Sequence, residues 1–163
     1  MLNLLKPKQY EPSIFHIDLR VLKEKNIRGV IIDIDDTLVE WHKKYASEKA
    51  KAWLKSLENE GFKVCLVSNN TEDRVVTFNE QLKLPAIHRA VKPRGAAFMK
   101  AMSWMNTTPD TTAVIGDQMF TDILGGNRMK LYTILVVPTS QERYTLRKLM
   151  RQVERMLLSK FYN

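Results

Sequence analysis

The sequence predicts an α/β fold in which helices cover both faces of a parallel central sheet, giving three layers. Four short apolar runs rich in β-branched residues are predicted to be buried strands, at residues 30–34, 64–67, 113–115 and 133–137. Helical patterns lie between these runs. Strands that alternate with helices form βαβ units, whose crossover connections make neighbouring strands parallel and cover the sheet on both sides.

Two helices between these strands are predicted from apolar residues at helical spacing. The first can begin at a Ser47 cap and end at Gly61, with one apolar face formed by Ala50, Trp53, Leu54 and Leu57. The second repeats this spacing at Phe98, Ala101, Met102 and Met105. The interval between residues 70 and 92 has room for another helix and a short strand.

The 163 residues, 44% of them hydrophobic, are enough for one domain that spans residues 1–163. No repeat, low-complexity tract or linker divides the chain. Residues 1–27 are expected to form an N-terminal extension that packs on the domain, and residues 141–163 a basic C-terminal helix.

The net charge of +8 favours anionic partners, which include phosphorylated metabolites, nucleic acid and anionic membranes. Residues 141–163 supply +4 of this charge, because six Lys and Arg residues stand against two Glu residues there. The single cysteine, Cys65, suits a reducing cytosol. No stretch reaches the ~20 apolar residues needed to span a bilayer. We therefore expect a cytoplasmic protein, either soluble or peripheral at a membrane surface.

The first predicted strand runs directly into three acids and a threonine, Asp33, Asp35, Asp36 and Thr37. Alternation along the strand lets Asp33 and Asp35 point toward a common side, at the carboxyl edge where open α/β sheets bind ligands. Two carboxylates at this spacing repel one another unless a cation or a shared proton relieves them. On its own, however, such a pair is more commonly an acidic loop that caps the next turn.

A calcium-binding loop is a second interpretation of these acids. Asp33, Asp35 and Thr37 could occupy its first, third and fifth positions. The pattern fails at Leu38, where such a loop has glycine, and at Lys44, where it has glutamate.

Asp-x-Asp-x-Thr-Leu at residues 33–38 resembles the first motif of the haloacid dehalogenase (HAD) superfamily. The other motifs of that superfamily follow in order, with Val67-Ser68-Asn69 after the second strand and Lys92-Pro93 before a helix. The last is Gly116-Asp117-Gln118-Met119-Phe120-Thr121-Asp122. Each piece alone could be a helix cap, a solvated lysine or a turn. Four of them at strand ends in the right order indicate a Rossmann-like HAD fold.

The resemblance implies a phosphomonoester hydrolase in which Asp33 forms an aspartyl-phosphate and Asp35 is the acid and base. It implies that the phosphoryl oxygens are held by Ser68, Asn69 and Lys92. It also implies a Mg²⁺ ion, a cation that prefers oxygen ligands, and the expected metal residues are Asp33, Asp35 through its main-chain carbonyl, Asp117 and Asp122.

The intervals between these motifs leave no room for a large cap domain. Leu5 to Tyr10 (Leu-x-Pro-x-x-Tyr), residues 13–18 and residues 121–128 resemble the YqeG group of class IIIA HAD phosphatases. That group is similar to phosphatidylglycerophosphate phosphatases, so the resemblance suggests a lipid phosphate as substrate. The sequence departs from the group at Asp36, where Asn is usual, a position outside the expected catalytic roles.

Two functions other than hydrolysis are compatible with parts of the sequence. A phosphorylatable receiver domain also combines carboxylates and a lysine on an α/β sheet, but its lysine comes near the end of the chain, whereas Lys92 precedes Asp117. The second alternative is a basic adaptor that binds RNA or a ribosome-associated partner, and no nucleic-acid-binding motif supports it.

The C-terminal segment carries an apolar stripe and several flanking cations. The stripe comprises Leu146, Leu149, Met150, Val153 and Leu157, and the cations are Arg147, Lys148, Arg151 and Arg155. Such a helix can pack its apolar side on the sheet with its arginines solvated, or it can contact an anionic membrane. The sequence leaves both possibilities open.

Overall fold

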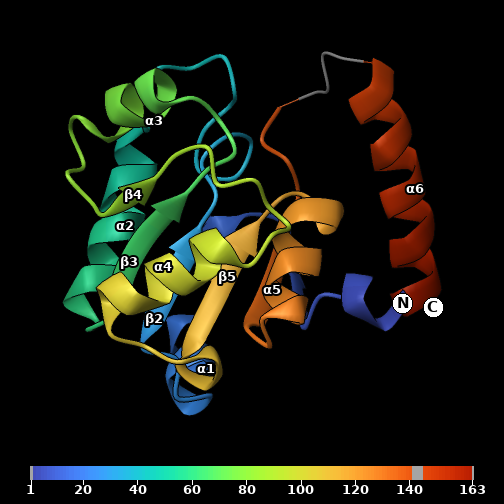
Figure 1. Cartoon of the computed structure of the whole chain (residues 1–163), viewed down its shortest axis with the longest axis horizontal. Coiled ribbons are helices and arrows are strands. Elements are labelled where there is room, and N and C mark those ends of the chain that lie inside the picture. Colours follow the sequence, from blue (N-terminus) through green and yellow to red (C-terminus); the bar gives the residue numbers. More distant parts are fainter. Residues whose placement is uncertain (1, 141–144, 163) are drawn as a thin grey trace.

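The computed structural model describes residues 2–140 and 145–162, and for residues 145–147 the backbone alone. Six parallel strands form one sheet in the order β1-β6-β5-β2-β3-β4 (Figure 1). The predicted α/β fold is therefore confirmed. The strands are β1 (Gln9–Glu11), β2 (Gly29–Ile32), β3 (Lys63–Val67), β4 (Ala86–Ile87), β5 (Thr112–Gly116) and β6 (Tyr132–Val136).

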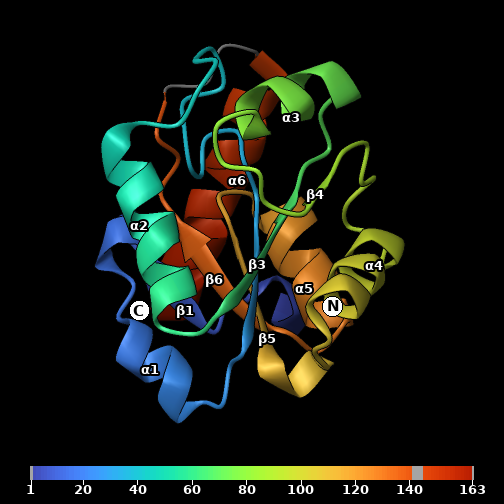
Figure 2. The same ribbon diagram turned by 90° about the vertical axis from the view of Figure 1, so that its left-hand side faces the viewer.

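Helices connect the strands and cover both faces of the sheet (Figure 2). The α-helices are α1 (Leu19–Glu24), α2 (Glu48–Asn59), α3 (Glu72–Asn79), α4 (Ala96–Met105), α5 (Leu124–Arg128) and α6 (Thr145–Tyr162). Short 3₁₀ turns occur at η1 (Leu2–Leu5), η2 (Ile14–His16) and η3 (Pro109–Thr111), and a π-helical turn at η4 (Met119–Ile123).

Alternating side chains of the central strand β2 enter two separate cores. Val30 and Ile32 pack with α1, α2 and α3 on one face, whereas Ile31 packs with α4 on the other. All four β2 residues are buried, as expected for a strand covered on both sides. The sheet is thus a rigid platform whose carboxyl edge can hold a site in place.

The predicted helices and strands are found with small shifts at their ends. The Ser47 side chain caps α2 by accepting a hydrogen bond from the Ala50 N–H at 3.1 Å. Gly61 follows this helix with φ of +88°, a conformation that glycine adopts without steric cost. The interval from 70 to 92 contains α3 and β4, as its length indicated.

The N-terminal residues do more than pack on the domain as an extension. Gln9, Tyr10 and Glu11 form β1, which pairs in parallel with β6 and adds an edge strand to the sheet. Three residues are too few to show the alternation that predicts a strand, so this strand could not be recognised from the sequence.

Helix α6 lies beside the β6 end of the sheet (Figure 1). Its inner face carries Leu157, Leu158 and Phe161, which pack on Met119, Ile123 and Leu135. Two charged residues of this helix, Arg151 and Glu154, are also buried. Among the described helices, none is long and apolar enough to cross a membrane.

Of the two possibilities left open for the apolar stripe, packing of the whole stripe on the sheet is not found. Leu149 and Val153 are exposed, whereas Arg151 is only 8% exposed. The helix packs over the carboxyl edge as well as beside the sheet, so charged groups with ionic partners can face inward. The side chains of residues 146 and 147 and the whole of residues 141–144 and 163 lie outside the described parts of the chain.

Candidate active site

Three neighbouring strands bring the predicted site residues to one edge of the sheet. Asp33 follows β2, Ser68 follows β3 and Asp117 follows β5, and β2 lies between the other two strands. The Asp33 N–H donates to the Ile115 carbonyl at 3.0 Å, which extends the pairing of β2 with β5. All three side chains are buried.

Lys92 links two of the predicted carboxylates. Its Nζ lies 2.6 Å from Asp33 Oδ1 and 2.7 Å from Asp122 Oδ1, and it also donates to the Val67 carbonyl at 2.8 Å. Burial alone would lower the pKa of Lys92, but the charges of Asp122 and Asp33 raise it above its usual value. The lysine is therefore a fixed positive charge beside Asp33.

Asn69 holds the loop that carries this lysine. Its Oδ1 accepts a hydrogen bond from the Lys92 N–H at 2.7 Å, and its Nδ2 donates to the Lys92 carbonyl at 3.3 Å. The Ser68 Oγ accepts from the Asn70 N–H at 3.1 Å. Of the residues expected to hold a phosphoryl group, Ser68 and Lys92 lie at the buried edge, whereas the amide of Asn69 is engaged with the main chain of Lys92.

Asp33, Asp117 and Asp122 form a buried carboxylate cluster. One oxygen from each lies within 4.8 Å of the other two. The Thr37 hydroxyl stands between two of them, 3.1 Å from Asp117 Oδ1 and 3.4 Å from Asp33 Oδ2. This donor set consists of hard oxygen atoms, the type that Mg²⁺ selects.

Asp122 reaches the cluster from the π-helical turn η4. Asp122 Oδ1 contacts Lys92, and Asp122 Oδ2 accepts a hydrogen bond from the Gln118 N–H at 3.2 Å, which fixes the carboxylate against the start of the turn. Gly116 makes room for it, because a Cβ at that position would lie 2.3 Å from Asp122 Cγ. A glycine is required here by close approach of a side chain to the strand.

The electrostatics of this buried edge favour an additional cation. Burial raises the pKa of Asp33 to about 7, and the opposing charge of Lys92 only partly offsets this effect. Burial also raises the pKa of Asp117 well above its usual range, against the opposing effect of Arg151 and with the repulsion of Asp33 and Asp122 added. For both carboxylates, the neighbouring positive charge only partly offsets the cost of burying the negative form.

Among the described residues, the charges of the ion-pair network can be counted for the state in which every carboxylate is ionised. The network contains two buried cations, Lys92 and Arg151, and four buried carboxylates, Asp33, Asp117, Asp122 and Glu154. Two positive charges against four negative ones leave an excess of two negative charges. A single divalent cation would balance that excess, so the residues present fit a Mg²⁺ ion.

Asp35 does not join this cluster, contrary to the expectation that its side chain shares a side with Asp33. Its Oδ1 accepts from Arg74 Nη2 at 2.8 Å and Nε at 3.0 Å, and its Oδ2 accepts from Asn70 Nδ2 at 2.9 Å. The strand β2 ends at Ile32, before Asp35, so the alternation used in the prediction no longer applies. The Asp35 side chain therefore lies on the β3 side of Asp33.

Two arginines complete the site and were not identified from the sequence as part of it. Arg74 of α3 binds Asp35 and donates to the Lys44 carbonyl at 3.1 Å. Arg151 of α6 donates to the carboxylate and the main-chain carbonyl of Asp117. Arginines at these positions carry no local signal of the site, because the aspartate that each one binds lies more than thirty residues away in the chain.

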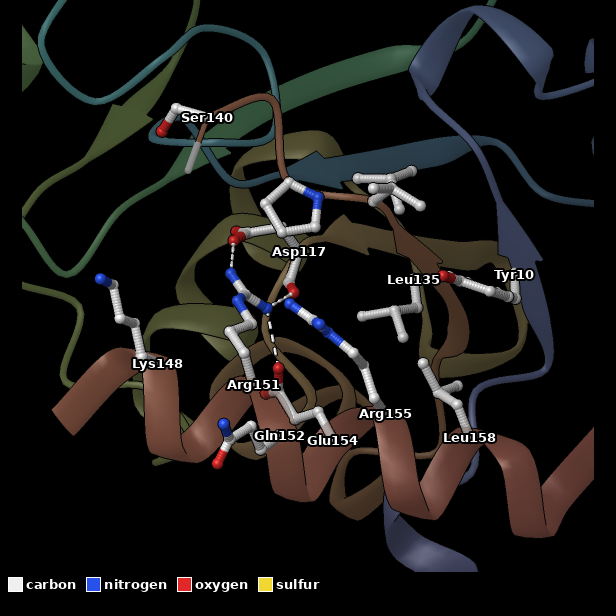
Figure 3. Close-up of a pocket in the computed structure, with 13 residues that line it drawn as sticks. Tyr10, Asp117, Leu135, Ser140, Lys148, Arg151, Gln152, Glu154, Arg155 and Leu158 are labelled. Carbon is white, nitrogen blue, oxygen red and sulfur yellow. Dashed lines mark hydrogen bonds and ion pairs between the residues drawn. The ribbon is translucent and has the colours of Figure 1, made fainter. Parts of the chain in front are cut away.

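A pocket of about 610 Å³ adjoins Asp117 between β6, the segment after it and α6 (Figure 3). One part of its wall is apolar and includes Leu135, Val137 and Leu158. Arg151 and Arg155 reach from α6 toward Asp117 across this space (Figure 3). The pocket thus combines an apolar wall with cationic side chains beside the carboxylate cluster.

Comparison with known proteins places the chain in a family. Residues 2–139 match the model of the family described as mitochondrial PGP phosphatase. The Probable phosphatase YqeG of Bacillus subtilis (strain 168) is 44% identical over 153 residues, which cover 94% of this chain and 89% of that protein. Phosphatidylglycerophosphate phosphatase 1, chloroplastic/mitochondrial, of Arabidopsis thaliana is 28% identical over 160 residues, covering 88% of this chain but only 43% of that longer protein.

Solved structures show the same fold at lower sequence identity. A HAD superfamily subfamily IIIA hydrolase from Legionella pneumophila is similar with a TM-score of 0.56 and 20% identity, covering 86% of this chain and 88% of that one. The cobalt-bound deoxy-D-mannose-octulosonate 8-phosphate phosphatase from Haemophilus influenzae has a TM-score of 0.55 and 17% identity, covering 84% and 90%. The chain therefore belongs to the mitochondrial PGP phosphatase family and is a phosphatase with the fold of the HAD hydrolases.

Proposed function

We propose that the protein is a Mg²⁺-dependent phosphomonoester hydrolase that works through an aspartyl-phosphate on Asp33. One observation carries this proposal: Asp33, Lys92, Asp117 and Asp122 meet at a buried sheet edge, where Asp33, Asp117 and Asp122 each bring a carboxylate oxygen within 4.8 Å of the other two. Asp33, Asp117 and the main-chain carbonyl of Asp35 would hold Mg²⁺, with Asp122 as a further ligand or support. The ion would neutralise charge on the transferring phosphoryl group.

In the first step, a carboxylate oxygen of Asp33 forms a bond to phosphorus while the bond from phosphorus to the ester oxygen breaks. Asp35 gives its proton to the departing alkoxide, which leaves as an alcohol. Lys92 and the Ser68 hydroxyl hold the non-bridging oxygens, since both lie at the same buried edge as the nucleophile.

In the second step, Asp35 takes a proton from water and the resulting hydroxide oxygen attacks phosphorus. The bond between phosphorus and the Asp33 oxygen breaks, which releases inorganic phosphate and restores the carboxylate. The Asp35 side chain lies apart from the metal-binding cluster. Arg74 and Asn70 donate to its two oxygens, so one of these contacts has to be released before Asp35 carries the proton of the first step.

The substrate that we propose is a lipid phosphate of the phosphatidylglycerophosphate type. The names of the family and of the Arabidopsis relative suggest this substrate. The pocket beside Asp117 supports it, because Leu135 and Leu158 can accept apolar atoms while Arg155 can pair with the second phosphate of such a molecule.

A peripheral contact with an anionic membrane would bring the enzyme to that substrate. Leu149, Val153 and Met156 lie on the outer face of α6, and Met156 is 67% exposed. Lys148 and Arg155 are exposed on the same helix. A helix with outward apolar and basic side chains can lie in the headgroup region of a bilayer.

Replacement of Asp33 by Asn tests the catalytic proposal. We expect a loss of at least about 10³-fold in turnover of both para-nitrophenyl phosphate and phosphatidylglycerophosphate in mixed micelles, because an amide cannot attack phosphorus. Asp110→Asn is the matched control, since Asp110 is exposed in η3, which directly precedes β5 and so lies away from its carboxyl end.

Three outcomes separate the parts of this proposal. Undiminished turnover by folded Asp33→Asn protein would remove Asp33 from the mechanism. Turnover that survives EDTA treatment would contradict the divalent metal. Hydrolysis of para-nitrophenyl phosphate without hydrolysis of phosphatidylglycerophosphate would reject the lipid substrate alone.

A further inference from the structure

We infer that Arg151 is a positioning residue for the metal site, and that α6 is thereby part of the catalytic centre. Arg151 holds one oxygen of Asp117 so that the other faces the position of the metal. This inference rests on the proposed metal-dependent function. The match to the family model ends at residue 139, so Arg151 lies beyond the part of the chain that the family assigns.

The contacts of Asp117 are divided between its two carboxylate oxygens. Arg151 donates to Oδ2 and, through its other terminal nitrogen, to the main-chain carbonyl of the same residue. The second oxygen, Oδ1, accepts from the Thr37 hydroxyl at 3.1 Å, and this hydroxyl also lies 3.4 Å from Asp33 Oδ2. Arg151 therefore holds Asp117 through its Oδ2 and its main-chain carbonyl, whereas Oδ1 lies on the side that faces Asp33.

Glu154 fixes the arginine in turn. Its Oε2 accepts from Arg151 Nη1 at 2.8 Å, and its Oε1 accepts from the Met119 N–H at 2.9 Å. Met119 begins η4, the turn that delivers Asp122 to the carboxylate cluster. The Arg151–Glu154 pair thus contacts the segments of both Asp117 and Asp122, and one turn of α6 ties them together.

The charges show that Arg151 supports a metal ion and does not replace it. With Arg151 included and the carboxylates ionised, the network among the described residues still has two more negative than positive charges. The Asp117 side chain is 0% exposed, so its carboxylate depends on fixed partners in place of water. Partners of this kind set the orientation of a ligand and raise the affinity of a metal site, typically by about 10- to 100-fold.

Direct metal binding provides the test. We would titrate wild type, Arg151→Gln, Arg151→Lys and the control Lys160→Gln with Mn²⁺, following free ion by electron paramagnetic resonance. Lys160 is exposed near the end of the same helix and does not line the pocket. We expect Arg151→Gln to weaken Mn²⁺ binding by about 10- to 100-fold and Arg151→Lys to restore part of the affinity. The control should match wild type.

Kinetics at saturating metal then separate positioning from a general structural defect. We expect Arg151→Gln to recover most of its kcat for para-nitrophenyl phosphate when Mg²⁺ is raised, with KM little changed. If this variant does not fold, Glu154→Gln keeps the contact of Arg151 with Asp117 and should weaken Mn²⁺ binding by a smaller factor. Unchanged Mn²⁺ affinity in folded Arg151→Gln, or tighter binding, would overturn the inference.

The Mn²⁺ titration and the turnover assay can fail separately, so they distinguish the positioning role of Arg151 from the proposed reaction. If wild type hydrolyses no phosphomonoester but Arg151→Gln still lowers Mn²⁺ affinity, the proposed function fails and the positioning role stands. If Asp33→Asn abolishes turnover but Arg151→Gln binds Mn²⁺ as wild type does, the proposed function stands and the positioning role of Arg151 fails.

Discussion

Two arginine–aspartate pairs flank Asp33, the proposed nucleophile, one on each side, and they differ in their access to solvent. The Arg74–Asp35 pair joins α3 to the loop after β2, with side chains 16% and 14% exposed. The Arg151–Asp117 pair joins α6 to the end of β5, with side chains 10% and 0% exposed. Both use the same chemical groups, but only the first keeps its carboxylate in contact with water.

This difference matches the two tasks that the proposed reaction requires. A group that exchanges protons with an alcohol and with water has to be reached by both, whereas a metal ligand has to be held still. Asp35 can exchange its partners when a substrate arrives, because Asn70 and Arg74 bind it at the rim. Asp117 is bonded to Thr37 and Arg151 and has no exposed surface.

The largest effects are expected when each aspartate is replaced by its isosteric amide. Asp35→Asn should lower kcat by about 10²- to 10⁴-fold, the usual contribution of general acid–base catalysis, and leave Mn²⁺ affinity unchanged. Asp117→Asn should weaken Mn²⁺ binding and also destabilise the fold by about 1–3 kcal/mol, because it removes the charge-assisted contact with Arg151, which keeps its pair with Glu154. Turnover, Mn²⁺ titration and chemical denaturation of both variants would measure these differences.

Equal losses of Mn²⁺ affinity in the two variants would show that the side chain of Asp35 is also a metal ligand. The distinction between a proton-transfer side and a metal side would then be wrong, although Asp33 could remain the nucleophile.

A smaller effect is expected from the arginine at the rim. Arg74→Gln removes the two donors to Asp35 Oδ1 and the donor to the Lys44 carbonyl, so the carboxylate is less well oriented toward a leaving group. We expect kcat to fall by about tenfold, with Mn²⁺ affinity unchanged and partial rescue by Arg74→Lys. A Mn²⁺ affinity reduced as far as in Arg151→Gln would remove the contrast between the two arginines.

Features defined by local pattern could be predicted from the sequence. Buried strands, the Ser47 cap and the acids after β2 all follow from residues that are close together in the chain. Parallel strands in a three-layer fold then bring their carboxyl ends together, which is why Asp33, Asp117 and Asp122 were expected in one place.

Features that depend on contacts between distant segments could not be predicted. Arg74 and Arg151 resemble surface cations in the sequence, and only packing shows that each meets an aspartate. The requirement for Gly116 likewise depends on Asp122, which approaches it through the π-helical turn. Apolar spacing alone could not show which face of α6 is buried, because part of this helix covers a charged surface.

The smallest effect on chemistry, and a selective effect on membranes, is expected from the outer face of α6. Leu149 and Met156 are 57% and 67% exposed, and they lie on the side of the helix opposite to the buried Arg151 and Glu154. Replacing both with Gln should leave Mn²⁺ affinity and para-nitrophenyl phosphate turnover unchanged, because neither residue contacts the site.

Apolar burial and the ~1 kcal/mol supplied by each basic residue near an anionic bilayer should both contribute to attachment of the wild type. The double variant should therefore bind vesicles containing phosphatidylglycerol about tenfold more weakly in co-sedimentation at low salt, and wild type should bind neutral vesicles poorly. Equal binding of wild type and variant would exclude this face as the contact, while reduced Mn²⁺ affinity in the variant would show that the two faces of α6 are coupled.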